Sequence, residues 1–295
     1  MKIIITGASG FLGQHLARYF EAEELITIGR TNGTIITALE KEVPTLPKAD
    51  LVVHSAGKAH MVPKTADEEE EFYAINVRGT QNLLNALSDK DALPAAFVFI
   101  SSIAVYGKDT GYLITENEPL DATDAYGKSK IEAERIVEEW CKQYHIPYAI
   151  LRLPLIAGSN PPGNLKSMIR GIKRGYYFNI AGGKARKSMV MAASIPPAIL
   201  PAVAVGGIFN LTDGHHPSFA ELSERIARQL NKKKPGSIPG TLAKFMSLAG
   251  SIIGKRSPLT KKNYKKMIND LTFDDAKART SFGWSPQSVI DNFKI

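Results

Sequence analysis

Tyr126 and Lys130 are the two residues of this chain whose types and spacing most directly suggest chemistry. Positions i and i+4 share one face of a helix, so a helix here would hold the ammonium beside the phenol. At about 4 Å and an effective dielectric of about 20, that charge contributes about 4 kcal/mol, or about three pKa units. We therefore predict that Lys130 lowers the pKa of Tyr126, and that Tyr126 acts as a general acid and base near neutral pH. The alternative is a pair that only shares a solvated helix face.

Ser102 is the second candidate, because it follows an apolar run at 96–100 and precedes Tyr126 by 24 residues. In a doubly wound sheet, the end of that strand and the start of the next helix meet over the ligand crevice. A hydroxyl at this place can hydrogen-bond a substrate carbonyl or alkoxide while Tyr126 transfers the proton. The alternative is a serine that only terminates a strand, which suits the neighbouring Ser101.

A glycine-rich segment, Thr-Gly-Ala-Ser-Gly-Phe-Leu-Gly at 6–13, follows the apolar run 2–6 and precedes a helical pattern from about 11 to 20. Glycines in such a turn let the backbone approach a pyrophosphate, which rests on the helix N-terminus. The spacing Gly-x-x-Gly-x-x-Gly differs from the usual Gly-x-Gly-x-x-Gly. Its position directly after a buried strand still predicts a dinucleotide site.

Apolar runs alternate with helical patterns over the first half of the chain. The expected strands are 2–6, 25–28, 34–37, 51–54, 96–100 and 148–151, and the expected helices run from about 11 to 20, 67 to 87 and 125 to 144. This alternation predicts an α/β fold, a Rossmann-type doubly wound parallel sheet with its ligand crevice beyond the strand ends. After Pro154 the pattern is less regular, with a loop at 158–164, a strand at 208–211 and a capping box at Ser218 and Glu221. We expect a smaller C-terminal α+β substrate region there, interleaved with the sheet.

Composition limits the class of protein. The 295 residues are 44% hydrophobic, which suits a globular chain with one large core or two smaller ones. Cys141 is the single cysteine, the N-terminus lacks a signal-peptide pattern, and no apolar stretch is long enough to span a bilayer. We therefore expect a cytoplasmic protein without stable membrane insertion. No metal site is expected, because the histidines and the cysteine lack the spacing of metal ligands.

The two halves of the chain carry opposite charge. Residues 1–150 hold 14 Lys and Arg against 22 Asp and Glu, a net charge of −8, whereas residues 151–295 hold 23 against 7, a net charge of +16. The basic half suggests an anionic ligand, a nucleic acid or an anionic membrane surface, or only a solvated basic surface. We do not expect nucleic-acid binding, because no aromatic residues are interleaved with the lysines. The apolar segment 242–253, followed by Lys255 and Arg256, leaves three alternatives: a membrane-surface helix, a helix packed over the substrate region, or a lid.

Together these residues resemble the extended short-chain dehydrogenase/reductases, the NAD-dependent nucleotide-sugar epimerase/dehydratase family. Besides the glycine turn, the resemblance is carried by Val-Val-His-Ser-Ala-Gly at 52–57, Asn-Val-Arg-Gly-Thr at 76–80, Ser-Ser-Ile-Ala-Val-Tyr-Gly at 101–107, Tyr-Gly-Lys-Ser-Lys at 126–130 and Leu-Arg-Leu-Pro-Leu-Ile-Ala-Gly at 151–158. It covers most of the chain. It implies an NAD(P)-binding Rossmann domain at 1–160, with core strands also contributed by the second half, and an interleaved nucleotide-sugar-binding region at 161–295.

The resemblance also implies roles for individual residues. Cofactor contacts are implied for Gly7, Ser9, Gly10, Phe11, Leu12, Gly13, Ser55, Ala56, Gly57, Asn76, Lys130, Pro154 and Ile156. The implied catalytic set is Ser102, Tyr126 and Lys130. Substrate contacts are implied for Ser102, Tyr126, Asn164, Leu165, Arg186 and Lys187, the last two as a basic clamp on the diphosphate of a nucleotide sugar. Homodimers through the helices at 67–87 and 125–143 are implied as well.

Two departures from the family's patterns narrow the expected reaction. A 4,6-dehydratase of this family has Thr-Asp-Glu where this chain has Ser102, Ile103 and Ala104, so elimination of water is not expected. A GDP-fucose-synthase-like epimerase has a cysteine just after the serine pair, where this chain has Ile103. What remains is hydride and proton exchange at one carbon, C4 of a UDP-type sugar.

Arg30 bears on the choice of cofactor. NAD enzymes usually place an acidic residue after the second strand to bind the ribose, whereas an arginine accommodates a 2′-phosphate. NADP is therefore slightly favoured over NAD, with Arg30 stacked on the adenine as the alternative. NADPH suits a UDP-4-keto-6-deoxy-sugar 4-reductase in surface polysaccharide biosynthesis. This reductase is the function that we favour from the sequence. The alternatives are a UDP-glucose or UDP-N-acetylglucosamine 4-epimerase that retains NAD, and a non-catalytic NAD(P)-sensing scaffold.

Overall fold

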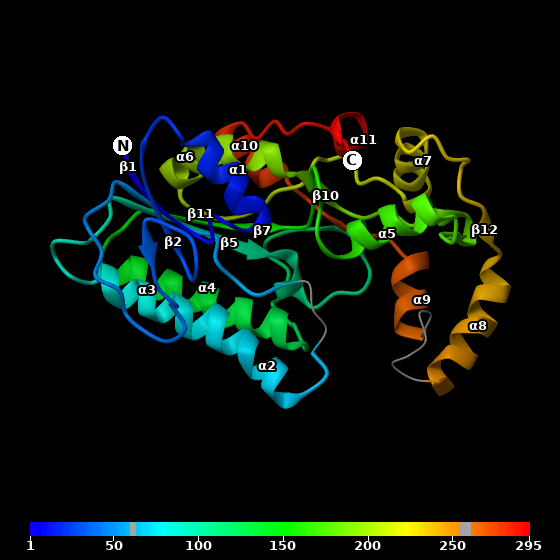
Figure 1. Cartoon of the computed structure of the whole chain (residues 1–295), viewed down its shortest axis with the longest axis horizontal. Helices are drawn as coiled ribbons and strands as arrows, with labels where there is room; N and C mark the ends of the chain where they lie inside the picture. Colours follow the sequence, from blue (N-terminus) through cyan, green and yellow to red (C-terminus); the bar gives the residue numbers. More distant parts are fainter. Residues whose placement is uncertain (60–62, 254–260) are drawn as a thin grey trace.

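The computed structural model of the chain describes residues 1–59, 63–253 and 261–295 (Figure 1). Within them, seven strands form one parallel sheet in the order β11-β7-β5-β4-β1-β2-β3. The strands are β1 (Lys2–Thr6), β2 (Glu24–Gly29), β3 (Ile35–Ile36), β4 (Leu51–His54), β5 (Ala96–Ser102), β7 (Tyr148–Leu153) and β11 (Gly207–Asn210). From β1 the chain adds β2 and β3 on one side of the sheet and then β4, β5, β7 and β11 on the other. The order of the strands therefore reverses between β1 and β4, which is where doubly wound folds bind their ligands. The predicted α/β Rossmann-type fold is confirmed.

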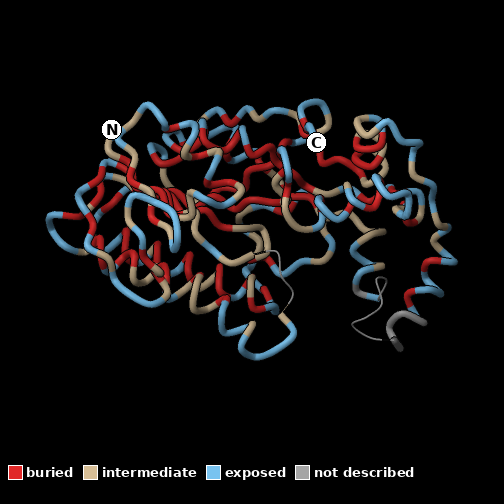
Figure 2. Tube along the Cα trace, in the orientation of Figure 1, coloured by how far each residue is buried: buried red, intermediate tan, exposed pale blue. Residues whose placement is uncertain are grey.

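Helices cover both faces of this sheet (Figure 1). One face carries α2 (Ala66–Tyr73), α3 (Gly79–Leu87) and α4 (Ala125–Gln143), and the other carries α1 (Phe11–Tyr19), α6 (Ile195–Val205) and α10 (Ala276–Phe282). Each face has its own buried apolar cluster, and Figure 2 shows buried residues running through the sheet and into the covering helices. The apolar runs of the strands are therefore buried from both sides, as parallel sheets require.

The start of α4 matters most for the site, because its first turn carries Tyr126. Asp124 caps the helix by accepting a hydrogen bond from the backbone N–H of Gly127, at 3.0 Å. A carboxylate at this position satisfies one of the N–H groups that the first turn leaves unpaired. The predicted helix from about 125 to 144 is confirmed, and its start is set by this cap.

The structure differs from the expected elements at two places. The predicted helix at 67–87 is interrupted by a π-helical turn at Ala74–Arg78, where one extra residue per turn re-aims the side chains. The proline-containing apolar stretch at 195–209, for which no helix was predicted, contains α6. Pro196 and Pro197 are tolerated in its first turn, because the N–H groups there have no helical partner, whereas Pro201 lies inside the helix.

Smaller elements lie beside the carboxyl ends of the strands, and the first half contributes one of them, β6 (Gly111–Ile114), which pairs with β13. The second half contributes β8 (Leu155–Ala157), α5 (Gly163–Arg174), β9 (Asn179–Ile180), β10 (Met189–Met191), α7 (Phe219–Gln229), β12 (Ser237–Ile238), α8 (Gly240–Ile253), α9 (Lys261–Ile268), β13 (Leu271–Phe273) and α11 (Val289–Asn292). The predicted capping box of Ser218 and Glu221 is present at the start of α7. Because β11, α6 and α10 also come from this half and complete the sheet layer, the two halves are interleaved in space. The division at residue 160 stays a prediction.

Helices α8 and α9 lie at the end of the molecule that also carries α5, α7 and β12 (Figure 1). Of the residues that the structure describes, none belong to a helix long and apolar enough to cross a membrane. Lys255 and Arg256, which were part of the predicted basic end of this segment, lie outside the described residues.

Candidate active site

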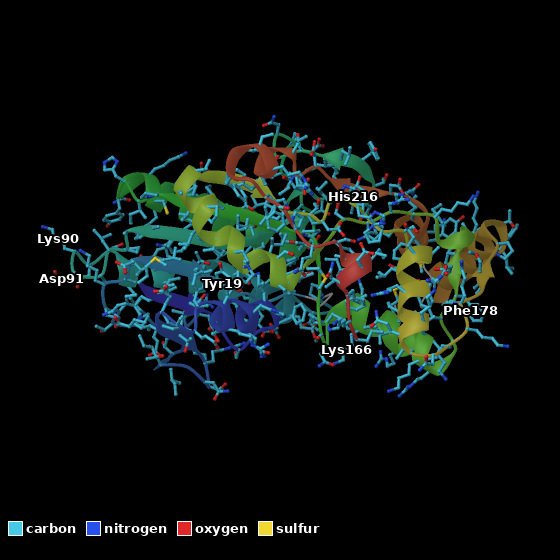
Figure 3. All side chains as sticks on the ribbon, turned by 90° about the horizontal axis from the view of Figure 1, so that it is seen from above. Tyr19, Lys90, Asp91, Lys166, Phe178 and His216 are labelled. Atoms are coloured by element: carbon cyan, nitrogen blue, oxygen red, sulfur yellow. The ribbon has the colours of Figure 1, made fainter. Side chains whose placement is uncertain are left out.

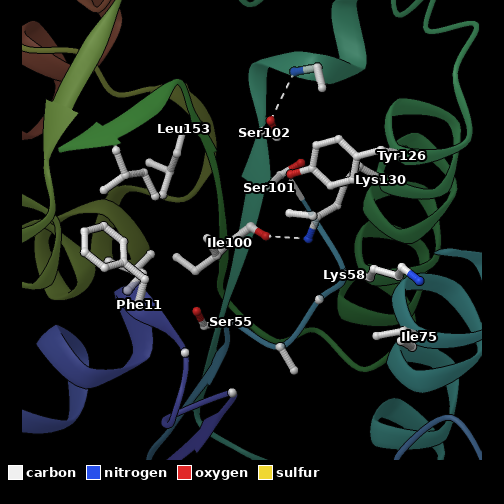
Figure 4. Close-up of a pocket in the computed structure, with 18 of the residues that line it drawn as sticks. Phe11, Ser55, Lys58, Ile75, Ile100, Ser101, Ser102, Tyr126, Lys130 and Leu153 are labelled. Atoms are coloured by element: carbon white, nitrogen blue, oxygen red, sulfur yellow. Dashed lines mark hydrogen bonds between the residues drawn. The ribbon is translucent and has the colours of Figure 1, made fainter. Parts of the chain in front are cut away.

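A cleft of about 910 Å³ lies beyond the carboxyl ends of β1, β4, β5 and β7 (Figure 4). Its walls bring together segments from the first half of the chain and, from the second half, residues 153–156, Pro162, Asn164, Lys266 and Leu271. Among the lining residues are the glycine turn, residues 28–30 and 54–59, residues 100–104, Tyr126, Lys130 and residues 153–156. This is the crevice in which open α/β sheets bind ligands.

The glycine turn at 7–13 forms one wall. Gly7 has φ +70°, and a Cβ on it would lie 2.8 Å from the backbone of Ala56. A Cβ on Gly13 would lie 2.0 Å from the carbonyl oxygen of Gly7. Gly10 occupies the N-cap of α1 and has no side chain with which to bind the first N–H groups of that helix. The turn thus combines close backbone approach with a helix N-terminus, the arrangement that binds a pyrophosphate.

The loop after β4 is tied to this turn and to α4. The Thr6 hydroxyl accepts a hydrogen bond from Ala56 N–H at 3.0 Å and pairs with the ring of His54 at 2.6 Å. Burial lowers the pKa of His54 to about 3, so this histidine is neutral at pH 7. Asn76 accepts from the N–H of Lys58 at 2.7 Å and donates to the Ser129 hydroxyl at 2.9 Å. Asn76, a predicted cofactor contact, is buried and positions the 55–59 loop against the start of α4.

Ser102 and Tyr126 meet in the cleft, as Figure 4 shows. Ser102 ends β5, and its hydroxyl accepts a hydrogen bond from Ala104 N–H at 3.2 Å, in the turn that leaves the strand. Tyr126 stands in the first turn of α4, and the Ser102 hydroxyl acts on it by lowering the pKa of the phenol. The two hydroxyls therefore lie near one another although 24 residues separate them in the chain.

The predicted effect of Lys130 on Tyr126 is wrong for the protein's own groups. The pKa of Tyr126 is raised, first by burial and also by the Asp124 carboxylate, while Ser102 acts in the opposite direction. The Lys130 ammonium instead donates to the carbonyl oxygen of Ile100 at 2.8 Å and lies 4.4 Å from the ring centroid of Phe99. Helical spacing placed the two residues on one face but could not show where the ammonium points.

Lys130 is buried, and burial lowers its pKa to about 8, while the Glu134 carboxylate acts to raise it. Its ammonium also lies near Gly57, where an added Cβ would be 3.4 Å from Nζ. Lys130 thus links three parts of the cleft wall: the end of β5, the loop after β4 and α4. An ammonium held there can bind the hydroxyl groups of a ribose through its remaining donors.

A buried polar network supports this wall from behind. Glu134 accepts from the Ser101 hydroxyl and forms an ion pair with Arg152, with a shortest distance of 2.7 Å. Arg152 also donates to the Tyr106 hydroxyl at 3.0 Å, and Tyr106 donates to Asn210 at 2.8 Å. These bonds join α4 to β5, β7 and β11. They hold in place the strand end that carries Ser102.

At the opposite end of the cleft, Arg30 lines the wall together with Thr37, Leu39 and Glu40. Its guanidinium lies 3.7 Å from the Glu40 carboxylate, and its side chain is 62% exposed. The predicted cofactor contacts Pro154 and Ile156 also line the cleft, beyond β7. The sequence identified Arg30 but not Glu40, because the contact needs the chain to return after β3.

The structure places some of the predicted substrate contacts in the cleft wall and others outside it. Asn164 lines the cleft at the start of α5, whereas Leu165 packs with Met168 and Ile172 in the buried cluster of the second half. Arg186 donates to the backbone of His216 and pairs with Glu221. Lys187 donates to the Asn269 carbonyl at 3.0 Å, and burial lowers its pKa to about 8. The structure does not bring Leu165, Arg186 or Lys187 into the cleft wall.

Lys266 on α9 lines the cleft instead, together with Lys108 and Asp109 after β5. Lys266 and Asp109 form an ion pair at 3.0 Å that joins the two halves of the chain at the cleft. Lys266 belongs to the basic second half of the chain, for which a solvated basic surface was one of the alternatives. The sequence did not indicate that Lys266 reaches the cleft, because the end of α9 is brought beside Asp109 only by the pairing of β13 with β6.

Ile103 and Ala104 line the cleft beside Ser102. Their apolar side chains cannot transfer protons, whereas the phenol of Tyr126, which lines the same part of the cleft, can. In the described ranges, no group of three or more His, Cys, Asp and Glu side chains could hold a metal ion.

Comparison with known proteins adds relatives of this fold. Residues 3–192 match the NAD dependent epimerase/dehydratase family. The chain is 27% identical to an N-acetyl-alpha-D-glucosaminyl-diphospho-ditrans,octacis-undecaprenol 4-epimerase of Escherichia coli O157:H7, over 98% of this chain and 92% of that protein. It is 25% identical to a UDP-glucose 4-epimerase of Vibrio cholerae, over 99% and 93%.

Solved structures share the architecture. A UDP-glucose 4-epimerase from Thermotoga maritima with UDP-glucose superposes with a TM-score of 0.74 at 20% identity, over 99% of this chain and 96% of that one. RMD from Pseudomonas aeruginosa, complexed with NADPH, gives a TM-score of 0.72 at 21% identity, with the same coverage. At these identities the superpositions support the fold described above.

Proposed function

The chain belongs to the NAD-dependent epimerase/dehydratase family and is an NAD(P)-dependent enzyme that modifies nucleotide sugars, and we propose that it transfers hydride at C4 of a UDP-sugar. The observation that carries this proposal is the cleft wall at 102–104 with Tyr126. It offers one phenol and one hydroxyl beside two apolar side chains. A single acid and base suits oxidation or reduction at one carbon, and it does not suit loss of water from two.

The roles of the residues follow from their places. A bound nicotinamide accepts or donates the hydride. Tyr126 removes the proton of the C4 hydroxyl as the carbonyl forms and returns it in the reverse direction. Ser102 hydrogen-bonds the same oxygen and stabilises the charge that develops on it. Lys130, held by the Ile100 carbonyl beside the loop after β4, would bind the cofactor ribose through its remaining N–H donors.

The cofactor end fits NAD(P) on observations of this structure. Gly7 and Gly13 leave no room for a Cβ, and α1 presents its N-terminus to the cleft wall. Arg30 supports NADP because its guanidinium can pair with a 2′-phosphate. Glu40 beside it supports NAD, since a carboxylate can accept from ribose hydroxyls. We therefore expect Arg30 and Glu40 together to determine whether the protein binds NADP or NAD.

Two reactions at C4 remain. The names of the Escherichia coli and Vibrio cholerae relatives support a 4-epimerase, in which the same cofactor is reduced and re-oxidised. Arg30 in the cleft wall supports a 4-keto-6-deoxy-sugar reductase in surface polysaccharide biosynthesis, which consumes NADPH. Both act on a sugar carried on a diphosphate, for which Asn164 and Lys266, which line the cleft, are candidate contacts.

Purified protein separates the reactions. An epimerase will interconvert UDP-glucose with UDP-galactose, or the N-acetylated pair, without net cofactor turnover. A reductase will consume NADPH only when a UDP-4-keto-6-deoxy-sugar is added. Failure of every UDP-sugar to react or to raise the melting temperature, with cofactor bound normally, would overturn the proposal of a UDP-sugar substrate.

Arg30→Ala tests the cofactor end. If Arg30 binds a 2′-phosphate, the substitution will weaken NADPH binding about tenfold and leave NADH binding nearly unchanged. Arg18→Ala, on the exposed side of α1, is the matched control and should change neither. Equal losses for both cofactors would show that Arg30 stacks on the adenine instead.

We also propose a homodimer through α2, α3 and α4. These helices form a groove of about 620 Å³, with Tyr73, Val77, Ile136 and Trp140 among its lining residues. Charged side chains of both signs, including Glu70, Arg78, Glu132 and Arg135, line the groove beside these residues, and such a mixed surface can pair with a second copy of itself. Light scattering of the purified protein, with Val77→Glu as the disrupting variant, tests this arrangement.

A further inference from the structure

Helix α8 (Gly240–Ile253) has large apolar side chains on the outside over 240–248, the part of it whose side chains the structure describes. Leu242, Phe245, Met246 and Leu248 are exposed, and Phe245 is 73% exposed. The buried positions in this part are small residues, Ala243 and Ser247. A surface helix normally buries its large apolar residues and presents polar ones to water. We call the four exposed residues the α8 surface.

The helical positions of these residues make them one face. At about 100° per residue, Leu242, Phe245, Met246 and Leu248 span about 160° of the helix, with Phe245 at the centre. Ala243 and Ser247 point the opposite way, toward the body, where Tyr264 of α9 donates to the Gly240 carbonyl at 3.1 Å. The α8 surface is therefore directed away from the protein and is not a lid folded onto the cleft.

The surroundings of the α8 surface are strongly basic. Residues 225–269 contain 12 Lys and Arg and no Asp or Glu. Lys244 on α8, and Lys265 and Lys266 on α9, are exposed among the residues that the structure describes. An apolar helix face within such a segment is the pattern of helices that lie in the interface of an anionic membrane. A second copy of the same surface is a poorer partner, because it would bring two such basic segments together.

This end of the molecule is also the end at which the cleft opens toward α9. Lys266 lines the cleft, and α9 connects to the body through the ion pair with Asp109. Figure 3 shows Phe178, which is half-exposed and precedes β9, at this same end, far from Lys90 and Asp91. Contact through α8 would hold the opening of the cleft close to the surface it binds.

We propose that the α8 surface binds the face of an anionic membrane, with its apolar side chains among the lipid headgroups and the lysines of α8 and α9 against the phosphates. The protein remains peripheral, because α8 is too short to span a bilayer. The proposal is independent of the reaction at C4. It concerns where the enzyme works and not what it does.

Vesicle binding of the full chain tests the proposal. The protein should co-sediment with vesicles of phosphatidylglycerol and phosphatidylcholine in equal parts, and far less with vesicles of phosphatidylcholine alone. Leu242→Ser with Phe245→Ser should lower the partition constant at least tenfold, because two large apolar side chains leave the interface. Lys244→Gln should lower it about fivefold, and 0.5 M salt should weaken binding of the unaltered protein.

Val205→Ser is the matched control, since Val205 is 52% exposed on α6 and lies outside the basic segment. It should leave vesicle binding unchanged. All variants should keep the turnover of soluble UDP-sugars, because none of these residues lines the cleft. Phe245→Trp gives a second readout: its emission should shift to shorter wavelength on anionic vesicles, because the two natural tryptophans, Trp140 and Trp284, are buried.

Three results would overturn the proposal. The first is no sedimentation with anionic vesicles and no emission shift of the Phe245→Trp protein. The second is equal binding by the unaltered protein and by the double variant. The third is a dimer in lipid-free buffer that the double variant dissociates while vesicle binding is absent, which would assign the α8 surface to a second copy of the chain.

Discussion

Around Lys130, at the catalytic end of the cleft, the polar side chains are held by buried partners, whereas Lys266 and Asp109 at the substrate end are exposed and pair with one another. Lys130 is buried against Ile100 and Phe99, and Glu134 behind it is fixed by Arg152. Lys266 and Asp109 at the other end have side chains that are 48% and 42% exposed. Buried polar groups without partners are expensive, so the first end has one arrangement, while the second can rearrange in water at little cost.

This difference suggests that the catalytic step and the recognition of the substrate depend on different parts of the cleft. A rigid wall suits the part of the reaction that every relative shares, hydride and proton transfer beside a nicotinamide. An exposed wall of few polar groups suits the part that differs among relatives, the sugar and its carrier. The comparison predicts large effects for substitutions at the first end and small ones at the second.

The largest effect should come from Tyr126→Phe. Loss of the proposed proton-transferring phenol should lower kcat about 10³-fold, with cofactor affinity nearly unchanged. Turnover of the UDP-sugar and binding of NAD(P) measure the two separately. Tyr112→Phe, at a tyrosine that is 74% exposed, should change neither. Normal turnover by the Tyr126 variant would remove the catalytic assignment.

Glu134→Gln should be the most damaging change to stability at the rigid end. It leaves the Arg152 charge buried without its carboxylate, which should lower the free energy of unfolding by about 3–5 kcal/mol. Denaturation by urea measures this change. The exposed pair of Glu139 with Arg135 provides the control, and Glu139→Gln should change stability by less than about 1 kcal/mol. Equal effects of the two substitutions would contradict the comparison.

Lys130 makes stability depend on alkaline pH. Its pKa in the folded protein is about 8, below the ordinary 10.5, because burial disfavours the charged form. Between these values the unfolded chain binds more protons, so this group makes folding more favourable as pH rises from 8 to 10.5, by up to about 3 kcal/mol. Unfolding of the cofactor-free protein at several pH values, with Lys130→Met as the reference, measures the difference. A difference that is constant with pH would mean that the ammonium is not buried.

The smallest effect should come from Lys266→Gln at the exposed end. An ammonium that is half-exposed contributes up to about 1 kcal/mol, so KM for the UDP-sugar should rise about fivefold with kcat unchanged. Arg186→Gln is the matched comparison and should leave KM unchanged, because Arg186 binds the His216 carbonyl outside the cleft wall. The reverse result would restore the basic clamp expected from the resemblance.

Much of this protein could be predicted from local patterns. Continuous apolar runs predict buried parallel strands, and the glycines at 7, 10 and 13 predict the turn after the first strand, because each of these signals depends on neighbouring residues. Ser102, Tyr126 and Lys130 could be selected for the same reason: their positions at a strand end and on one helix face are local properties.

The orientation of the Lys130 ammonium, the position of Lys266 and the outward face of α8 could not be predicted in this way. Each depends on contacts between residues far apart in the chain, such as the pairing of β13 with β6 or the packing of α8 on α9. By itself, the sequence determined the fold class and the glycine turn after the first strand, and it selected Tyr126 as the residue proposed here to act as acid and base. Only the tertiary structure decided which charges reach the cleft, because the direction of a long side chain is set by the groups packed around it and not by its spacing along the chain.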